Sequence, residues 1–309
     1  TELNGGKGFK PVGFSPSAGL SFNGSLDGKR HVVKNLYIDR KGEYHVALFG
    51  AVKSGTVKNI GLTNVNISGT RYTAGLVGEL GSESRISRSF TSGSVDGGDF
   101  YSGGVVGFNE GEIIESFSSA FVKGEDTVGV IAGSNNAPLA AEGTASISKS
   151  YSTGFANATG GRSVTDAGGL VGSNVEPETI SNSYSVAGAS APVQEGKVAG
   201  VNSGALSETY FDSSTFSTSA GIGEDRNSQD TTSLLTSQMQ GSSAETNMAG
   251  LDFQDTWTST FSYPKLSWQK SGSGTRDDPY QIYTCRDLQA MKNDKDAYYE
   301  LAVDVDCSA

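Results

Sequence analysis

Short apolar segments recur along the chain and are separated by Gly, Asn and Ser. The first block, VALFGAV, spans Val46 to Val52, and five related blocks follow: AGLVGEL, GGVVGFN, VGVIAGSN, GGLVGSN and VAGVNSG. Their equivalent glycines, spaced 28, 29, 26, 39 and 28 residues apart, are Gly50, Gly78, Gly107, Gly133, Gly172 and Gly200. Apolar runs of this length favour strands, and the residues between them favour turns.

A second element follows most of these blocks and places an aromatic residue directly after a hydroxyl residue. The aligned aromatic residues are Phe90, Phe117, Tyr151, Tyr184 and Tyr210. The hydroxyl residues before them are Ser89, Ser116, Ser150, Ser183 and Thr209. We expect the aromatic residues to stack as a ladder and the hydroxyl residues to form hydrogen bonds from one repeat to the next.

One repeat has too few apolar residues to bury a core alone, whereas stacked repeats can share one. A unit of about 26–29 residues with two or three short strands predicts an all-β fold, specifically a parallel β-helix. Successive coils would then rise by ~4.8 Å, the strand spacing in a sheet. The recurring glycines would serve turns or the close approach of backbones.

These blocks resemble the GLUG-motif family of repeat proteins. AGLVG (Ala74 to Gly78) and GGLVG (Gly168 to Gly172) match the motif, while VGVIAGSN and VAGVNSG depart from it. The resemblance implies a right-handed parallel β-helix, here of about six to eight coils. It also implies a secreted or surface protein of the adhesin or filamentous-haemagglutinin type, with no catalytic residues in the motif.

The remaining sequence predicts four segments. Residues 1–222 form the β-helix, 223–269 a cap at its C-terminal end, 270–279 a linker, and 280–309 a tail with a helix and a strand. Within the cap, a short helix is expected over residues 231–241 because Gly241 can end it. The apolar residues expected in the tail are Tyr280, Ile282, Leu288, Met291, Tyr299, Leu301, Val303 and Val305.

The only two cysteines, Cys285 and Cys307, both lie in the tail. We predict a disulfide between them, because no other cysteine competes, and this would imply an oxidising, extracellular setting. Two free buried thiols are the alternative interpretation.

The tail resembles the segment that precedes the first coil in GLUG proteins, so the order of the chain looks permuted. Three interpretations follow: one period of a tandem protein, a subunit whose tail caps the next subunit, or a tail that folds back on its own N-terminus. A ten-residue linker reaches at most about 35 Å, which makes the third the least favoured. We therefore expect the protein's partner to be another copy of itself, joined head to tail.

Composition restricts the function classes further. The chain has 309 residues, a net charge of −11 and a sequence pI near 4.7, which argues against general nucleic-acid binding. No run of 18 apolar residues predicts membrane insertion, and the N-terminus has no signal-peptide pattern, as expected of a mature or a cytosolic form.

Candidate chemistry is sparse, and we predict no catalytic, cofactor or metal residues. The acidic pairs Asp96/Asp99, Glu110/Glu112 and Glu125/Asp126 are expected to be solvated turn charges, with Asp96/Asp99 and the segment GEDRNSQD as weak calcium candidates. His31 and His45 are expected to pack or to face solvent. Three sequons, at Asn23, Asn66 and Asn157, are possible N-glycosylation sites.

The sequence thus favours a non-enzymatic extracellular protein, a β-solenoid subunit of a cell-surface stalk or filament. An adhesin module that binds a carbohydrate or a partner protein along one face is the alternative. A carbohydrate-active enzyme is the third.

Overall fold

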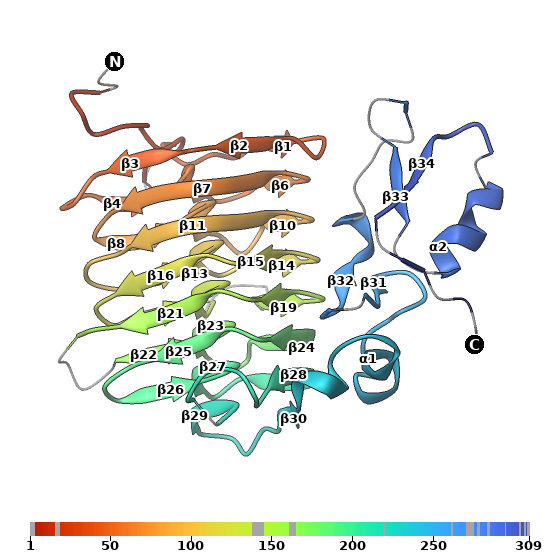
Figure 1. The fold of residues 1–309 in the computed structure, drawn as a ribbon. Coiled ribbons are helices and arrows are strands. Elements are labelled where there is room, and N and C mark those ends of the chain that lie inside the picture. Colours follow the sequence, from red (N-terminus) through yellow and green to blue (C-terminus); the bar gives the residue numbers. More distant parts are fainter. Residues whose placement is uncertain are drawn as a thin grey trace. The chain divides into compact units, whose positions relative to one another are not determined.

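The computed structural model describes residues 4–15, 19–137, 145–160, 165–218, 220–260, 262–269, 275–276, 279–282, 285–293, 295–302, 304–305 and 307. The chain divides into two compact units, Thr1–Leu234 and Leu235–Ala309 (Figure 1). Strands dominate the first unit, whose described residues contain no helix, so the predicted all-β class is confirmed there; the second unit combines short strands with short helices. Among the described residues, no helix has the length and apolar character needed to cross a membrane.

The first unit contains three sheets in which every strand pair is parallel. The seven-stranded sheet consists of β5 (Phe49–Val52), β9 (Val77–Leu80), β13 (Val106–Asn109), β18 (Ala132–Asn135), β23 (Val171–Asn174), β27 (Ala199–Asn202) and β29 (Ile222–Asp225). The six-stranded sheet consists of β4 (Tyr44–Val46), β8 (Arg71–Ala74), β12 (Ser102–Gly103), β17 (Thr127–Gly129), β22 (Asp166–Gly168) and β26 (Gln194–Gly196).

The third sheet has seventeen strands and is called the long sheet below. Its strands are β1 (Ser25–Asp27), β2 (Val32–Lys34), β3 (Tyr37–Asp39), β6 (Thr56–Lys58), β7 (Gly61–Ser68), β10 (Arg85–Ser87), β11 (Phe90–Asp96), β14 (Glu112–Ile114), β15 (Phe117–Ser118), β16 (Phe121–Gly124), β19 (Ser146–Ser148), β20 (Tyr151–Ser152), β21 (Phe155–Ala158), β24 (Thr179–Ser185), β25 (Gly188–Ser190), β28 (Ala205–Asp212) and β30 (Thr232–Leu234).

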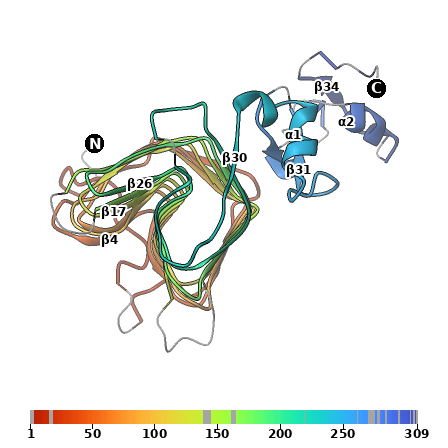
Figure 2. The ribbon, with the colours of Figure 1, turned by 90° about the horizontal axis from the view of Figure 1, so that it is seen from below.

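Each repeat passes through the three sheets in the same order: six-stranded, seven-stranded, long. Every strand then pairs with the strand at the equivalent position of the neighbouring repeat, so the strands overlie one another when viewed along the stack (Figure 2). The parallel ladders extend beyond residue 222, where the sequence pattern ended the repeats, to β30 at Leu234.

In-register pairing places like residues on top of one another inside the stack. The long sheet supplies one such column, fully buried, with Val57, Ile86, Ile113, Ile147 and Ile180. Burying apolar side chains contributes about 25 cal/mol per Å² removed from water, and here each side chain is covered by its equivalents in the neighbouring repeats. The core therefore belongs to the stack and not to any one repeat.

The predicted aromatic ladder is confirmed from Phe90 to Tyr184 and the hydroxyl column from Ser89 to Ser183, but the hydroxyl of Thr209, the last predicted member, is buried without a hydrogen-bond partner. The rings of Phe90, Phe117, Tyr151 and Tyr184 stack with centroids 4.8, 4.9 and 5.0 Å apart and interplanar angles of 5–7°. Three hydroxyl oxygens of the column accept a hydrogen bond from a backbone N–H of the preceding repeat, and these contacts are Ser89 N to Ser116 Oγ, Ser116 N to Ser150 Oγ and Ser150 N to Ser183 Oγ.

The recurring glycine of the motif allows two sheets to approach closely. A Cβ built on Gly107 would lie 2.7 Å from the carbonyl oxygen of Gly78 and 2.9 Å from that of Tyr101. Since real Cβ atoms essentially never come this near to backbone oxygens, any larger residue would push the six- and seven-stranded sheets apart.

A buried asparagine ladder was not anticipated from the sequence. Asn109, Asn135, Asn174 and Asn202 occupy equivalent positions on the seven-stranded sheet and are fully buried. Each side-chain Nδ2 donates to the Oδ1 of the next residue, at 2.7, 2.7 and 2.8 Å. Asn202 in turn donates to Asp225 Oδ1 at 3.2 Å, so an acceptor-only carboxylate ends the chain of amides.

The second unit is small. Its elements are η1 (Thr236–Gln238), α1 (Ser242–Asn247), β31 (Trp257–Thr258), β32 (Lys265–Leu266), η2 (Ser267–Gln269), β33 (Tyr280–Ile282), α2 (Cys285–Ala290), η3 (Met291–Asn293) and β34 (Tyr299–Leu301). The helix predicted over residues 231–241 was wrong. Residues 232–234 instead pair with Tyr210–Asp212 of β28, because an open sheet edge provides backbone partners that outweigh local helix preference.

Asn135→Ala tests the asparagine ladder. The substitution removes the partner of Asn109 Nδ2 and of Asn174 Oδ1, and each unpaired buried polar group costs about 1–3 kcal/mol. We expect the free energy of unfolding, measured by urea denaturation, to fall by about 2 kcal/mol or more. The exposed Thr153→Ala is the matched control, expected to stay within about 0.5 kcal/mol of the parent protein. Equal effects of the two substitutions would contradict the role of the ladder.

Candidate assembly interface

The first strands of the long sheet lack a neighbour on one side. Among the described residues, β1 pairs only with β6 and β2 only with β7. Leu26 and Val33 lie in register with the fully buried Val57 and Leu62, yet Leu26 is partly exposed and Val33 is 37% exposed. These two side chains mark an end of the core that nothing described in the first unit covers.

The N-terminal segment covers a different part of this end. Phe9 N donates to Tyr37 O at 2.9 Å, and Val12 N donates to Leu48 O at 3.0 Å. Isolated bridges join Gly8 to β3, and Val12 and Phe22 to β5. The edges of β3 and β5 are therefore partly occupied, whereas those of β1 and β2 are open.

Exposed apolar side chains gather in the same region of the sequence. Of fourteen exposed large hydrophobic residues among those described, seven fall within the first 44 positions: Val12, Phe14, Leu20, Val32, Val33, Tyr37 and Tyr44. An unpaired strand edge beside exposed apolar groups is a ready template for another strand. The sequence analysis missed this surface.

The open edge is basic although the protein is acidic. Residues 25–34, which include β1 and β2, contain three Lys or Arg and one Asp, a net charge of 3 − 1 = +2, against −11 for the whole chain. Lys29, Arg30 and Lys34 flank the strands β1 and β2 and are exposed. This cluster of cations is the sequence signal that could have identified the edge.

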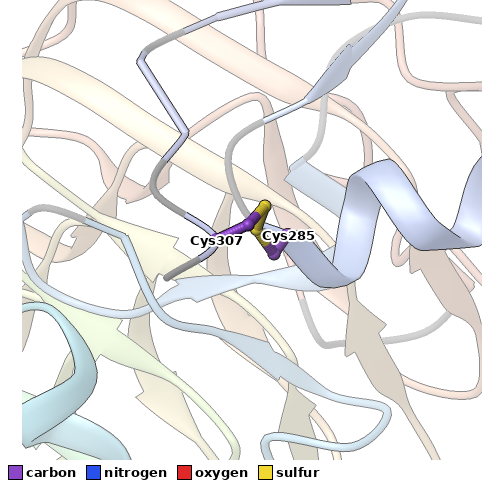
Figure 3. Close-up of a disulfide and its surroundings, with 2 residues drawn as sticks. All are labelled: Cys285 and Cys307. Atoms are coloured by element: carbon purple, nitrogen blue, oxygen red, sulfur yellow. A yellow bond between two sulfur atoms is a disulfide. The ribbon is translucent and has the colours of Figure 1, made fainter. Parts of the chain in front are cut away.

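The tail forms a small unit around two parallel strands. β33 pairs with β34 in the register Tyr280↔Tyr299 and Ile282↔Leu301, with α2 between them in the chain. The predicted disulfide is present: Cys285 at the start of α2 is bonded to Cys307 after β34, with Cα atoms 5.5 Å apart (Figure 3). The disulfide ties the helix to the end of the chain.

The predicted tail residues that the structure describes fall into three groups by exposure. Ile282 is buried, and Tyr280, Met291, Tyr299 and Val305 are partly exposed. Leu288 and Leu301 are exposed, at 42% and 60%. Val303 lies outside the described residues. Residues 295–307 contain one Lys and four acidic residues, a net charge of 1 − 4 = −3, opposite to the open edge.

The three sequon asparagines all face outward. Asn23 lies before β1 and is exposed, and Asn66 is an exposed residue of β7. Asn157 is a partly exposed residue of β21. All three are therefore sterically open to modification in the folded first unit.

An ion-pair network connects the first three repeats on the outer side of the seven-stranded sheet. His45 Nε2 lies 2.8 Å from Glu79 Oε2, and Lys53 Nζ contacts Glu79 Oε1 at 2.5 Å and Glu110 Oε2 at 3.2 Å. Gly81 leaves space for the Lys53 side chain to pass. Burial opposes ionisation of Glu79, but hydrogen bonds from His45 and Lys53 outweigh it and lower the pKa of Glu79. Burial raises the pKa of Glu110.

This network corrects part of the sequence interpretation. Glu110 was expected to be a solvated turn charge, but only 12% of its side chain is exposed. Asp126 was interpreted in the same way and is buried. His45 packs, as expected, stacked on Tyr72 with ring centroids 4.7 Å apart. The shared offset of Lys53 and Glu110, three residues after their motif glycines, is the signal that could have linked them.

A second buried carboxylate belongs to Asp166 on β22, which is 3% exposed. Burial raises the pKa of Asp166 to about 6; Arg226 opposes this shift, while Glu224 and Asp126 add to it. Within the described part of the chain, no three His, Cys, Asp or Glu side chains are grouped so that they could hold a metal ion.

Comparison with known proteins shows two similarities, and no family model matches the chain. Halomucin from Haloquadratum walsbyi (strain DSM 16790 / HBSQ001) is 29% identical over 287 residues, which cover 88% of this chain but only 3% of halomucin. The crystal structure of a "putative immunoglobulin A1 protease" from Bacteroides ovatus aligns with a TM-score of 0.59 at 21% identity, covering 84% of this chain and 81% of that one. At that identity, the structural similarity shows the fold alone.

Asp166→Asn tests the buried carboxylate. Because the pKa of Asp166 is raised from 3.8 to about 6, its contribution to stability is present below pH 4 and is lost as the pH rises through 6. At pH 7.5 we expect the variant to be more stable than the parent by roughly 1–3 kcal/mol, and at pH 4 to be nearly equal. Urea denaturation at both pH values, with the exposed Asp230→Asn as control, measures this difference. A pH-independent effect would refute the assignment.

Proposed function

We propose that the protein is a structural, non-enzymatic β-solenoid of the GLUG type, in which the repeats form a right-handed parallel β-helix of about six to eight coils. Three parallel sheets visited in a fixed order, with residues of successive repeats in register, support this architecture. The recurring motif glycine, which the close approach of two sheets requires, supports the GLUG assignment.

The first unit is the rod in this proposal, and the tail is the connector between rods. The tail of one unit covers the open core end of the next, with β34 adding to the edge of β1 and β2 as in strand-addition complexes. The observation that carries the proposal is complementarity. The open edge, residues 25–34, has uncovered apolar residues and a charge of +2, and residues 295–307 have exposed apolar residues and a charge of −3.

This contact is heterologous, because two different surfaces meet, and it need not close into a ring. Repeated use would build a stalk or filament whose partner at each junction is another copy of the same unit. The junction is covalent if units follow one another in a longer chain.

The proposed location is extracellular. The disulfide between Cys285 and Cys307 favours an oxidising environment. The similarity to halomucin supports the same location. The net charge of −11 suits a soluble, mutually repelling surface.

A second candidate function is adhesion to a carbohydrate along one face of the rod. The outward-facing Phe121 and Phe155, whose ring centroids are 6.0 Å apart, favour it because aromatic rings bind sugars. A glycan array probed with the chain lacking its tail separates the two functions, since assembly needs the tail and adhesion does not. Carbohydrate cleavage is the third candidate. The structure favours it least, because the two neighbouring carboxylates, Glu79 and Glu110, both form ion pairs with Lys53.

Deletion of residues 271–309 tests the head-to-tail junction. Sedimentation velocity over a range of concentrations should show association of the full chain and a monomer without the tail. Val33→Lys should abolish association in the same way, because it places a charge at the open end of the core. Val193→Lys, at a valine far along the chain that is 45% exposed against 37% for Val33, is the matched control and should associate normally. Unchanged association after the deletion would rule out the junction.

A further inference from the structure

The outer face of the long sheet contains a row of phenylalanines that the rod does not need for its core. Phe121 on β16 and Phe155 on β21 are in register, with centroids 6.0 Å apart and rings inclined by 10°. Phe216 packs edge-on against Phe155 at 5.5 Å. Phe121 and Phe216 are 45% and 54% exposed.

At the next equivalent position after Phe121 and Phe155, the chain has a glycine in place of an aromatic residue. Gly188 on β25 lies in register with Phe155, and a Cβ there would meet the rings of both Phe155 and Phe216. The missing side chain lets Phe216 approach from its own loop. The three rings thus form a continuous apolar surface on the outer face, which we call the phenylalanine platform.

Asn157 stands beside this platform. Side chains alternate along β21, so Phe155 and Asn157 point outward while Ala156 and Ala158 are buried. Two residues along a strand correspond to about 6.6 Å, roughly the reach of one sugar ring attached to the asparagine. Thr159 completes the sequon, and the order Phe-Ala-Asn-Ala-Thr places an aromatic ring directly behind the acceptor amide.

The other two sequons lack this arrangement. Asn23 Oδ1 accepts a hydrogen bond from Ser21 Oγ at 3.1 Å, and Ser21 occupies the position that Phe155 has relative to Asn157. At Asn66 the corresponding residue is Asn64, whose Nδ2 donates to Asn35 Oδ1 at 2.7 Å. Asn66 does have an exposed aromatic neighbour, Tyr37, in register with it on β3, but only Asn157 has a phenylalanine two residues before it whose ring lies in a row with others.

We propose that Asn157 carries an N-linked glycan whose first pyranose ring packs on the phenylalanine platform. The amide Nδ2 of Asn157 attacks C1 of a sugar carried on a lipid phosphate or diphosphate. The bond from C1 to the phosphate oxygen breaks, the lipid (di)phosphate leaves, and a base of the transferase takes the amide proton. The attached sugar then presents one face of electropositive C–H groups to the electronegative faces of Phe155 and Phe121.

The proposal explains why large apolar side chains stand outward here. A sugar ring would cover apolar surface of Phe121 that no described residue covers and would anchor the base of the glycan against the rod. It depends on the extracellular location proposed above. Protease treatment of intact cells tests that location separately, so a missing glycan on exported protein counts against the glycan site alone.

The test uses the full chain exported from a host that performs N-glycosylation. Peptide mass mapping should find Asn157 occupied to a greater extent than Asn66, and Thr159→Ala should abolish that occupancy. Ser68→Ala, which removes the Asn66 sequon from the same face, should leave Asn157 modified. Enzymatic deglycosylation should lower Tm by about 2 °C or more in the parent protein.

The platform is tested by Phe155→Ala and, independently, by Phe121→Ala. Each variant, compared before and after deglycosylation, should lose most of the Tm difference that the glycan confers on the parent. An unmodified Asn157 on exported protein would overturn the proposal. So would a Tm difference of the same size in both variants and the parent, because the sugar would then not contact the rings.

Discussion

Parallel pairing in register between neighbouring repeats is the constraint on which the first unit depends. No repeat holds enough apolar surface for its own core, so each gains its partners for backbone hydrogen bonds and for side-chain packing from the repeats on either side. In-register pairing then places similar residues on top of one another. Isoleucine lies on isoleucine in the long sheet, phenylalanine on tyrosine in the aromatic ladder, and asparagine on asparagine in the seven-stranded sheet.

The same constraint makes the ends of the stack different from its middle. A repeat with only one neighbour leaves strand edges unpaired and core residues uncovered, and this is the state of β1, β2, Leu26 and Val33. The tail offers a separate parallel pair, β33 and β34, closed by a disulfide and carrying exposed Leu288 and Leu301. Identical units can join head to tail only if two different surfaces fit each other, and here these are the uncovered end of the stack and the oppositely charged tail.

Much of the fold follows from the sequence because the stack is periodic. The spacing of the motif glycines sets the repeat length, and the columns of aromatic and hydroxyl residues follow from it. The asparagine ladder could not be predicted in this way, because Asn is also common in turns. Only the pairing register in the structure shows that Asn109, Asn135 and Asn174 stack. The strand at 232–234 was missed because its partner, β28, is supplied by the tertiary structure.

The candidate interface was only half predictable. The tail was identified by its cysteines and its alternating apolar residues, but the surface that it would cover depends on which edges stay open after folding. The charges of Glu110 and Asp126 were misjudged for the same reason, because burial between repeats is not visible in a local pattern. The period of the sequence identifies which residues are equivalent, but whether a residue is exposed depends on its contacts with the neighbouring repeat.

Hydrogen–deuterium exchange of β1 and β2 tests the central claim most directly. In assembled material the account predicts slow exchange of amides in residues 25–34, and fast exchange of the same amides when the tail is deleted, with β10 and β14 unchanged in both. Equal exchange of residues 25–34 with and without the tail would contradict the account, because it would mean that no strand of the tail pairs with the open edge.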